Sequence, residues 1–212
     1  MSDLPSSPAA ERNWQPILNA LKSVLPERGG LLEIASGTGQ HAALLAPALP
    51  GWVWQPTEAN SAALPTIAAW TQKTQALNVR PPCLLNAIEQ AWPSDDETLA
   101  SAFRLPFDAV LCANLLHIAP WAACLGLMAG AARHLKPGGL LVVYGPFFEN
   151  SVSPSQGNLN FDASLRQQDA VWGIRQREAV DEAAANNGLS AHQRIEMPAN
   201  NLMLVYQRAT GA

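Results

Sequence analysis

The sequence predicts a single α/β domain with a mostly parallel, Rossmann-like sheet and helices on both of its faces. Strand-like apolar segments alternate with helix-like segments, as in sheets whose parallel strands are joined by crossover helices. A glycine turn, Gly37-Thr38-Gly39, separates the first apolar segment from the helix that follows it. The chain has 212 residues, which suits one domain over residues 1–212.

Residues 1–30 are expected to form an N-terminal helical segment. Ser7-Pro8 is a suitable cap and first-turn pair for a short helix, and apolar residues recur at helical spacing beyond it. Because proline lacks a backbone donor, Pro16 predicts that the longer helix restarts near Asn13. Arg12 and Asn13 are candidates for a lid over a bound cofactor, with an ordinary exposed helix as the alternative.

The alternating segments continue to the fifth strand. Each expected strand is a short apolar run bounded by turn residues, and each expected helix has apolar residues three and four positions apart. The turn Lys136-Pro137-Gly138-Gly139 ends the last of these helices, since proline and glycine stop helices. The expected strands are residues 31–36, 52–57, 82–85, 107–113 and 140–144, and the expected helices are residues 40–49, 61–76 and 121–135.

The C-terminal part is expected to contain a polar loop, helices and an edge hairpin. Residues 145–162 are rich in Ser, Asn, Pro and Gly and too long for a simple connection, which favours a functional loop. A helix or helix pair follows over 163–186, with Asp162 most simply interpreted as its N-cap. Strands at 192–197 and 202–207 then form an antiparallel hairpin.

The glycine turn is the candidate ligand site. Gly37 and Gly39 permit positive φ angles and a close approach of a ligand, and the helix start after them suits a carboxylate or phosphate. Glu58 lies 21 residues after Gly37, at the end of the second strand, where an acid accepts hydrogen bonds from ribose hydroxyls. The run from Gly37 to Ala42 also fits the relaxed dinucleotide fingerprint, so this pattern alone does not select the cofactor.

Two further features favour S-adenosylmethionine over a dinucleotide. Glu33 is an acid four residues before Gly37, a position that is acidic in class I methyltransferases and usually apolar in dinucleotide-binding strands. The Leu135–Gly139 turn before an apolar fifth strand is frequent in the same class. A vestigial site is a third interpretation.

Motifs along nearly the whole chain resemble one narrower family. They are SPAAERN at 7–13, EIASGTGQH at 33–41, NLLHIAPW at 114–121, YGPF at 144–147, NFD at 160–162, WGIR at 172–175 and MPANN at 197–201. The chain thereby resembles the bacterial proteins of a domain of unknown function whose animal relative is called methyltransferase-like protein twenty-six. The resemblance implies a class I methyltransferase fold with seven strands, the last antiparallel, and implies no proven substrate. Ala35 stands where a glycine is usual in the class, and we expect its methyl group to be tolerated in an extended backbone.

With S-adenosylmethionine as cofactor, each of its parts is assigned to a segment. The amino-acid end is expected over residues 35–39, the ribose at Glu58 and the adenine near Asn86 and Ala87, although a turn-forming role for Asn86 is an equal alternative. His41 is expected to pack beside the cofactor. The predicted cofactor-binding residues are Arg12, Asn13, Glu33, Ala35, Ser36, Gly37, Thr38, Gly39, His41, Glu58, Asn86, Ala87 and Asn114.

The candidate catalytic residues are His117, Tyr144 and Asn114. His117 follows the fourth strand and is the first candidate for removing a proton from the acceptor, with a packing or capping histidine as the alternative. Asn114 ends the same strand and is expected to face the crevice where such sheets bind ligands. His41 and Asp162 are weaker candidates for the proton.

Several other polar and aromatic residues are expected either to line a substrate pocket or to lie away from the site. Trp172, Arg175 and Phe147 either line a substrate pocket with Tyr144 or belong to the core. His134 and His192 are expected at the surface. Cys83, Cys112 and Cys124 lack metal-ligand spacing and are interpreted as reduced core thiols, so we expect no metal.

The overall composition limits the classes of partner that the chain is expected to bind. The net charge is −4 and no stretch gathers Lys and Arg, so a nucleic-acid duplex is not an expected partner. The segment Met1–Pro5 has no signal-peptide features and no apolar run approaches membrane-spanning length, which favours the cytoplasm and excludes a membrane partner. Three functions remain: a small-molecule methyltransferase, a cofactor-binding interaction protein without chemistry, and a nicotinamide-dependent oxidoreductase. The oligomeric state is left open.

Overall fold

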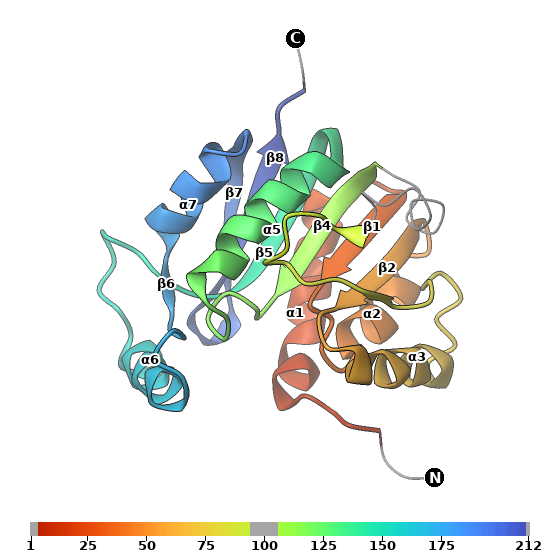
Figure 1. Ribbon diagram of the computed structural model, residues 1–212, viewed down its shortest axis with the longest axis horizontal. Helices are drawn as coiled ribbons and strands as arrows, with labels where there is room; N and C mark the ends of the chain where they lie inside the picture. The colour runs from red at the N-terminus through yellow and green to blue at the C-terminus, as the bar shows by residue number, and fades with distance from the viewer. Residues whose placement is uncertain (1–3, 94–105, 211–212) are drawn as a thin grey trace.

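A computed structural model of the chain describes residues 4–93 and 106–210 (Figure 1). Residues 1–3, part of the Met1–Pro5 segment that is expected to lack a signal peptide, and residues 94–105, part of the expected single domain, lie outside the described residues. In the described part, no helix is long and apolar enough to cross a bilayer.

Seven strands of the described part follow one another across a sheet in the order β3-β2-β1-β4-β5-β8-β7. The pairs from β3 to β5 are parallel, whereas β8 is antiparallel to both of its neighbours, β5 and β7. This confirms the predicted mixed sheet with an antiparallel last strand. The strands are β1 (Gly29–Ile34), β2 (Trp52–Glu58), β3 (Cys83–Leu84), β4 (Phe107–Ala113), β5 (Leu135–Phe148), β7 (Leu189–Met197) and β8 (Asn201–Arg208), with a two-residue β6 (Arg175–Gln176) paired to the end of β5.

Helices cover both faces of the sheet (Figure 1). Successive side chains of a strand point to opposite faces, so Leu31 of β1 packs with α1 and α2 while Leu32 packs with α5 and α7. Each face thus has its own apolar core. The longer helices of the described part are α1 (Pro8–Val24), α2 (Gln40–Leu45), α3 (Leu64–Lys73), α5 (Trp121–His134), α6 (Gln156–Gln168) and α7 (Arg177–Ala185).

Helix α1 is continuous, so the expected restart near Asn13 is wrong. Pro16 lies inside the helix and removes one backbone hydrogen bond. The helix is held on both sides of this position. Ser7 caps its N-terminus, and Ile17 and Leu21 are fully buried. Burial of the C-terminal half therefore outweighs the local cost of the proline.

The region after the fifth strand differs from the expected long polar loop. Strand β5 extends to Phe148 because Gly145 and Pro146 pair with β8. Helix α6 begins at Gln156, where Ser155 is the N-cap, so only residues 149–155 form the connection. Asp162 lies inside α6, and the expectation that it caps a helix is wrong. Its Oδ1 accepts a hydrogen bond of 2.7 Å from the Ile174 N–H instead.

His134 is buried, which corrects its expected surface position. Its Nδ1 lies 2.7 Å from the Gly130 carbonyl oxygen, and its ring stacks on Trp92 with centroids 5.1 Å apart. His192 is exposed, as predicted. Cys112 and Cys124 are buried free thiols, whereas Cys83 is only partly buried.

Candidate functional site

The turn between β1 and α2 brings three left-handed residues together. The φ angle is +57° at Ala35, +57° at Gly37 and +85° at Gly39. A Cβ atom on Gly39 would lie 2.6 Å from the Ile67 Cα of α3, so only glycine fits there. A Cβ on Gly37 would meet nothing within 4 Å. Gly39 therefore lets the turn pack on α3, while the turn at Gly37 faces open space.

Ala35 is left-handed and not extended, which corrects our expectation. A non-glycine residue in this region costs about 1 kcal/mol or more. The backbone on both sides is fixed to β2, since the Ser36 N–H donates to the Thr57 carbonyl at 2.8 Å and Thr57 Oγ1 donates to the Glu33 carbonyl at 2.6 Å. Strain of this kind is retained at ligand sites where the surrounding structure imposes it.

Glu58, at the end of β2, points to the glycine turn. Its Oε2 accepts a hydrogen bond of 2.9 Å from the Gly37 N–H, and its Oε1 accepts from the N–H groups of Ala59 and Asn60. A carboxylate oxygen can accept more than one hydrogen bond, so both oxygens can also accept from a ligand. The acid is thus fixed beside the turn, where the sequence predicts it.

Glu33 is a buried acid beneath the same turn. It is 1% exposed, and its Oε2 accepts a hydrogen bond of 2.9 Å from Trp54 Nε1. Burial raises the pKa of its carboxyl group to about 7, and the hydrogen bond from Trp54 acts in the opposite direction. A cation bound nearby would favour the ionised form.

The N-terminal segment is hydrogen-bonded to the helices that flank the turn. The Ser7 N–H donates to Gln40 Oε1, which also accepts a hydrogen bond of 3.0 Å from Thr38 Oγ1. The Pro5 carbonyl accepts from Trp70 Nε1 at 2.8 Å. Gln40 was missed as a site residue. The available signal was a long amide side chain at the first helical position after the glycines.

Asn13 connects α1 to α2 and β5. Its Oδ1 lies 2.8 Å from His41 Nε2, and its side chain also hydrogen-bonds Tyr144. Burial lowers the pKa of His41 to about 4 and raises the pKa of Tyr144. This buried cluster is therefore uncharged at neutral pH.

A cavity of about 740 Å³, the main cavity, lies between α1, the ends of β4 and β5, α6 and residues 198–201. It brings together Arg12, Asn13, Asn114, His117 and Tyr144 of the predicted site residues. Asn114 is left-handed at the end of β4, and its N–H donates to the Tyr144 carbonyl at 2.8 Å. The other lining residues are Ser7, Ala9, Pro16, Ile118, Pro146, Gly157, Asn158, Phe161, Pro198, Ala199, Asn200 and Asn201.

His117 is a neutral imidazole in the wall of the main cavity. It is 7% exposed, and its ring meets Phe161 edge-on with centroids 5.6 Å apart. Burial, followed by the charge of Arg175, lowers its pKa to about 4. The ring is therefore uncharged at neutral pH and can accept a hydrogen bond from a donor in the main cavity.

Arg175 supports the segment that carries His117 and does not line the main cavity. Its Nε donates to the Leu116 carbonyl at 2.8 Å, and its Nη2 donates to the carbonyls of Ala119 and Val171. Trp172 and Phe147 are also absent from the residues that line the main cavity. Of the four residues expected in a substrate pocket, only Tyr144 lines it.

Two further expectations concern the adenine and a metal. Asn86 Oδ1 accepts a hydrogen bond of 3.1 Å from the Ile88 N–H, as in the turn-forming interpretation. Its contact with adenine stays a prediction, as does that of the buried Ala87. Within residues 4–93 and 106–210, no three His, Cys, Asp or Glu side chains are grouped so that they could hold a metal ion.

The strand order, the glycine turn after β1 and the acid at the end of β2 define a class I methyltransferase fold. The chain belongs to the family described as "Protein of unknown function (DUF938)", whose model matches residues 4–208.

Solved structures with this fold include several methyltransferases. The pyocyanin biosynthetic protein PhzM is 17% identical with a TM-score of 0.73 over 97% of this chain and 60% of its own. An O-methyltransferase family 2 protein from Planctomyces limnophilus, in complex with apigenin, is 16% identical with a TM-score of 0.72 over 92% of this chain and 62% of its own. Human N-acetylserotonin methyltransferase, in complex with SAM, is 14% identical with a TM-score of 0.68 over 93% of this chain and 52% of its own. The chain thus spans three fifths or less of two of these proteins and 62% of the third, and at these identities the likeness shows the fold.

Proposed function

We propose that the protein is an S-adenosylmethionine-dependent methyltransferase whose small-molecule acceptor binds in the main cavity. The observation that carries the proposal is the Glu58 carboxylate fixed on the Gly37 N–H, at an open turn of left-handed residues. The main cavity contacts the same α1 helix that is hydrogen-bonded to α2.

The residues at the turn fit the parts of this cofactor. Glu58 would accept hydrogen bonds from the ribose hydroxyls, and the turn at Gly37 would receive the amino-acid end. The Glu33 carboxylate would stabilise a nearby ammonium group. Asn86 and Ala87, which follow β3, would lie at the adenine. The bound cofactor supplies a methyl group on a positively charged sulfur, so the chemistry needs no metal.

The acceptor is proposed to be a hydroxyl group that His117 deprotonates. Its neutral ring lines the main cavity and accepts a hydrogen bond from the hydroxyl; as the oxygen gains the methyl group and the sulfur–methyl bond breaks, the hydroxyl proton becomes strongly acidic and passes to the ring. Asn114 and Tyr144, on the neighbouring strands β4 and β5, would orient the acceptor, because positioning the reactants in line contributes much of the rate. Because the pKa of His117 is about 4, its neutral form persists above that pH and is lost as the pH falls through about 4. Several proteins with this fold are named as O-methyltransferases, which supports the choice of acceptor atom.

Three finer proposals rest on sequence. The motifs at 33–41 and 114–121 support a relationship to methyltransferase-like protein twenty-six. The unpaired cysteines support a cytoplasmic location. The net charge of −4 supports a small-molecule acceptor over a nucleic acid.

Isothermal titration with S-adenosylhomocysteine tests the proposed function. We expect saturable binding that Glu58→Ala weakens about ten- to a hundredfold, because a hydrogen bond to a charged group contributes about 1.5–3 kcal/mol. Glu27→Ala removes an exposed carboxylate at the other end of β1 and should leave the affinity unchanged. No binding at millimolar ligand, or tighter binding of a nicotinamide dinucleotide, would refute the proposal. Binding without turnover on any hydroxyl acceptor would favour an interaction protein.

A further inference from the structure

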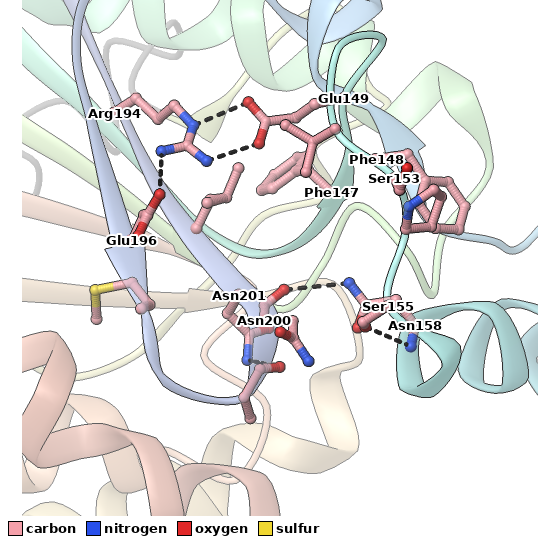
Figure 2. A pocket seen from close by; sticks show the side chains of 15 residues that line it. Phe147, Phe148, Glu149, Ser153, Ser155, Asn158, Arg194, Glu196, Asn200 and Asn201 are labelled. Atoms are coloured by element: carbon pink, nitrogen blue, oxygen red, sulfur yellow. Dashed lines mark hydrogen bonds and ion pairs between the residues drawn. The ribbon is translucent and has the colours of Figure 1, made fainter.

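A second cavity, of about 430 Å³, lies beside the main cavity, and we call it the side cavity (Figure 2). It is enclosed by the end of β5, residues 149–155, the start of α6, β7 and residues 199–202. Phe147, which the sequence offered for a substrate pocket, lines it, and none of the other predicted site residues does. Its lining residues are Phe147, Phe148, Glu149, Val152, Ser153, Pro154, Ser155, Asn158, Arg194, Glu196, Met197, Ala199, Asn200, Asn201 and Leu202.

The two cavities share one wall. Asn158, Ala199, Asn200 and Asn201 line both of them. Asn158 Nδ2 donates a hydrogen bond of 3.2 Å to the Asn200 carbonyl, which links α6 to the opposite side of the wall (Figure 2). Ala199 and Asn200 are both left-handed, at φ angles of +58° and +56°. Both residues lie in the turn that joins the paired strands β7 and β8, where positive φ angles match the twist of the strands, so the hairpin holds this wall in place.

Helix α6 covers both cavities and is lightly packed. Among its residues only Leu165 is buried, and Leu159 and Phe161 are more than 40% exposed. Figure 1 shows α6 standing away from the helices that cover the sheet. A helix with so little buried apolar surface can shift at small cost, and a shift that breaks the hydrogen bond from Asn158 to the Asn200 carbonyl would open a passage between the cavities.

The charges of the side cavity select against an anion. Arg194 donates through Nε and Nη2 to Glu149 and through Nη1 to Glu196 (Figure 2). Outside the cavity lining, Arg177 also donates to Glu149. The guanidinium group of Arg194 is therefore already neutralised by carboxylates. The Glu196 side chain is 82% exposed and keeps capacity for a further donor. Phe147 and Phe148 supply an apolar wall.

We propose that the two cavities form one acceptor-binding tract and that the acceptor is an elongated molecule with a hydroxyl at one end and an amine at the other. The hydroxyl end lies beside His117 in the main cavity. The stem crosses the shared wall between Asn158 and Asn200, and its apolar part lies on Phe147 and Phe148 in the side cavity. The amine reaches Glu196 in the side cavity. This inference rests on the proposed function for the role of the main cavity.

Binding of four catechol probes tests the tract. They are catechol itself and catechol carrying at C4 a six-carbon chain that ends in an amine, a hydroxyl or a carboxylate. Calorimetry with and without S-adenosylhomocysteine should show the amine probe at least about tenfold tighter than catechol, which corresponds to one or two new polar contacts. The carboxylate probe should bind no tighter than catechol. Glu196→Gln should reduce the preference for the amine over the hydroxyl.

A bulky substitution in the side cavity tests the contribution of that cavity to binding independently of the main cavity. Val152 lines the side cavity and is 51% exposed, so Val152→Trp can fill the cavity without disturbing the core. It should abolish the gain from the amine chain and leave catechol and S-adenosylhomocysteine binding unchanged. Val171→Trp, at a 52% exposed position outside both cavities, is the matched control and should behave as wild type. Ser153→Phe is a second filling variant in case Val152→Trp unfolds.

The outcomes distinguish this inference from the proposed function. Equal affinity for all four probes, failure of all four to bind, or undiminished discrimination in a folded filling variant would overturn the tract. Absence of S-adenosylhomocysteine binding in the wild type would contradict the proposed function alone, because the probe titrations are also run without it.

Discussion

Replacing Glu33 by glutamine should change how the stability of the protein depends on pH. Burial raises the pKa of the Glu33 carboxyl group from 4.5 to about 7. Between these two values the folded protein holds a proton that the unfolded chain has released. The free energy of unfolding therefore falls as the pH rises through this interval.

The size of the change in the free energy of unfolding follows from the width of this pH interval. The loss is about 1.4 kcal/mol for each pH unit, so the roughly 2.5 units between 4.5 and about 7 give on the order of 3 kcal/mol. Glutamine keeps an acceptor for Trp54 Nε1 and a donor in place of the protonated oxygen. The stability gained by Glu33→Gln should therefore grow from pH 4.5 to about 7 and stay constant above that pH.

The two buried histidines act in the opposite direction. Burial lowers the pKa values of His41 and His117 from 6.5 to about 4, so the stability that their neutral rings contribute is present above pH 6.5 and lost as the pH falls toward 4. Both rings are present in the wild type and in the variant. Their contributions cancel in the difference between the two proteins, which isolates Glu33.

Urea denaturation of both proteins at several pH values between about 4.5 and 8 measures this difference. Glu27→Gln removes an exposed carboxylate and is the matched control, for which a curve parallel to the wild type is expected. Parallel curves for Glu33→Gln and the wild type would refute the reasoning, because they would mean that Glu33 is ionised in the folded protein at the same pH as in the unfolded chain.

Three further predictions are measured by denaturation at neutral pH. Gly39→Ala should destabilise by more than about 2 kcal/mol, because its Cβ would collide with the α3 backbone, whereas Gly37→Ala should cost only about 1 kcal/mol for its left-handed conformation; equal losses would contradict the packing argument. Asn13→Ala should cost about 1–3 kcal/mol by leaving the buried His41 ring without its partner, and an unchanged midpoint would show that water replaces it. Arg175→Lys keeps the charge but not the planar fork that reaches three carbonyls, and a loss of about 2 kcal/mol is expected, with full stability as the opposing result.

Most of the fold was predictable because it depends on local patterns. The expected strand at 107–113 agrees with β4 at both ends, since an apolar run there is bounded by turn residues. The region after β5 was not predictable in this way. Gly145 and Pro146 read as turn residues, but pairing with β8, more than fifty residues later, keeps them in the sheet. The break expected near Pro16 is also absent for a reason that local pattern does not contain. Burial of other residues of α1 keeps the helix continuous through the proline.

At the candidate site, the spacing of residues in the sequence predicted which strand carries each polar side chain. It did not predict the backbone conformation or the hydrogen-bond partners around those side chains. Glu58 lies beside Gly37 as its position predicted, because parallel strands end at one edge of the sheet. The left-handed conformation of Ala35 has no signal in a residue that favours other conformations. The roles of Gln40 and Arg175 depend on side-chain reach to distant backbone atoms, which spacing does not encode.

The acids and glycines proposed to hold the methyl donor lie between residues 33 and 58, whereas α6 and residues 198–201, which cover the acceptor side, follow β5. Only one side chain of α6 enters the core. An exchange of this exposed helix and short turn could therefore change the acceptor proposed to bind there without altering the strands proposed to bind the donor.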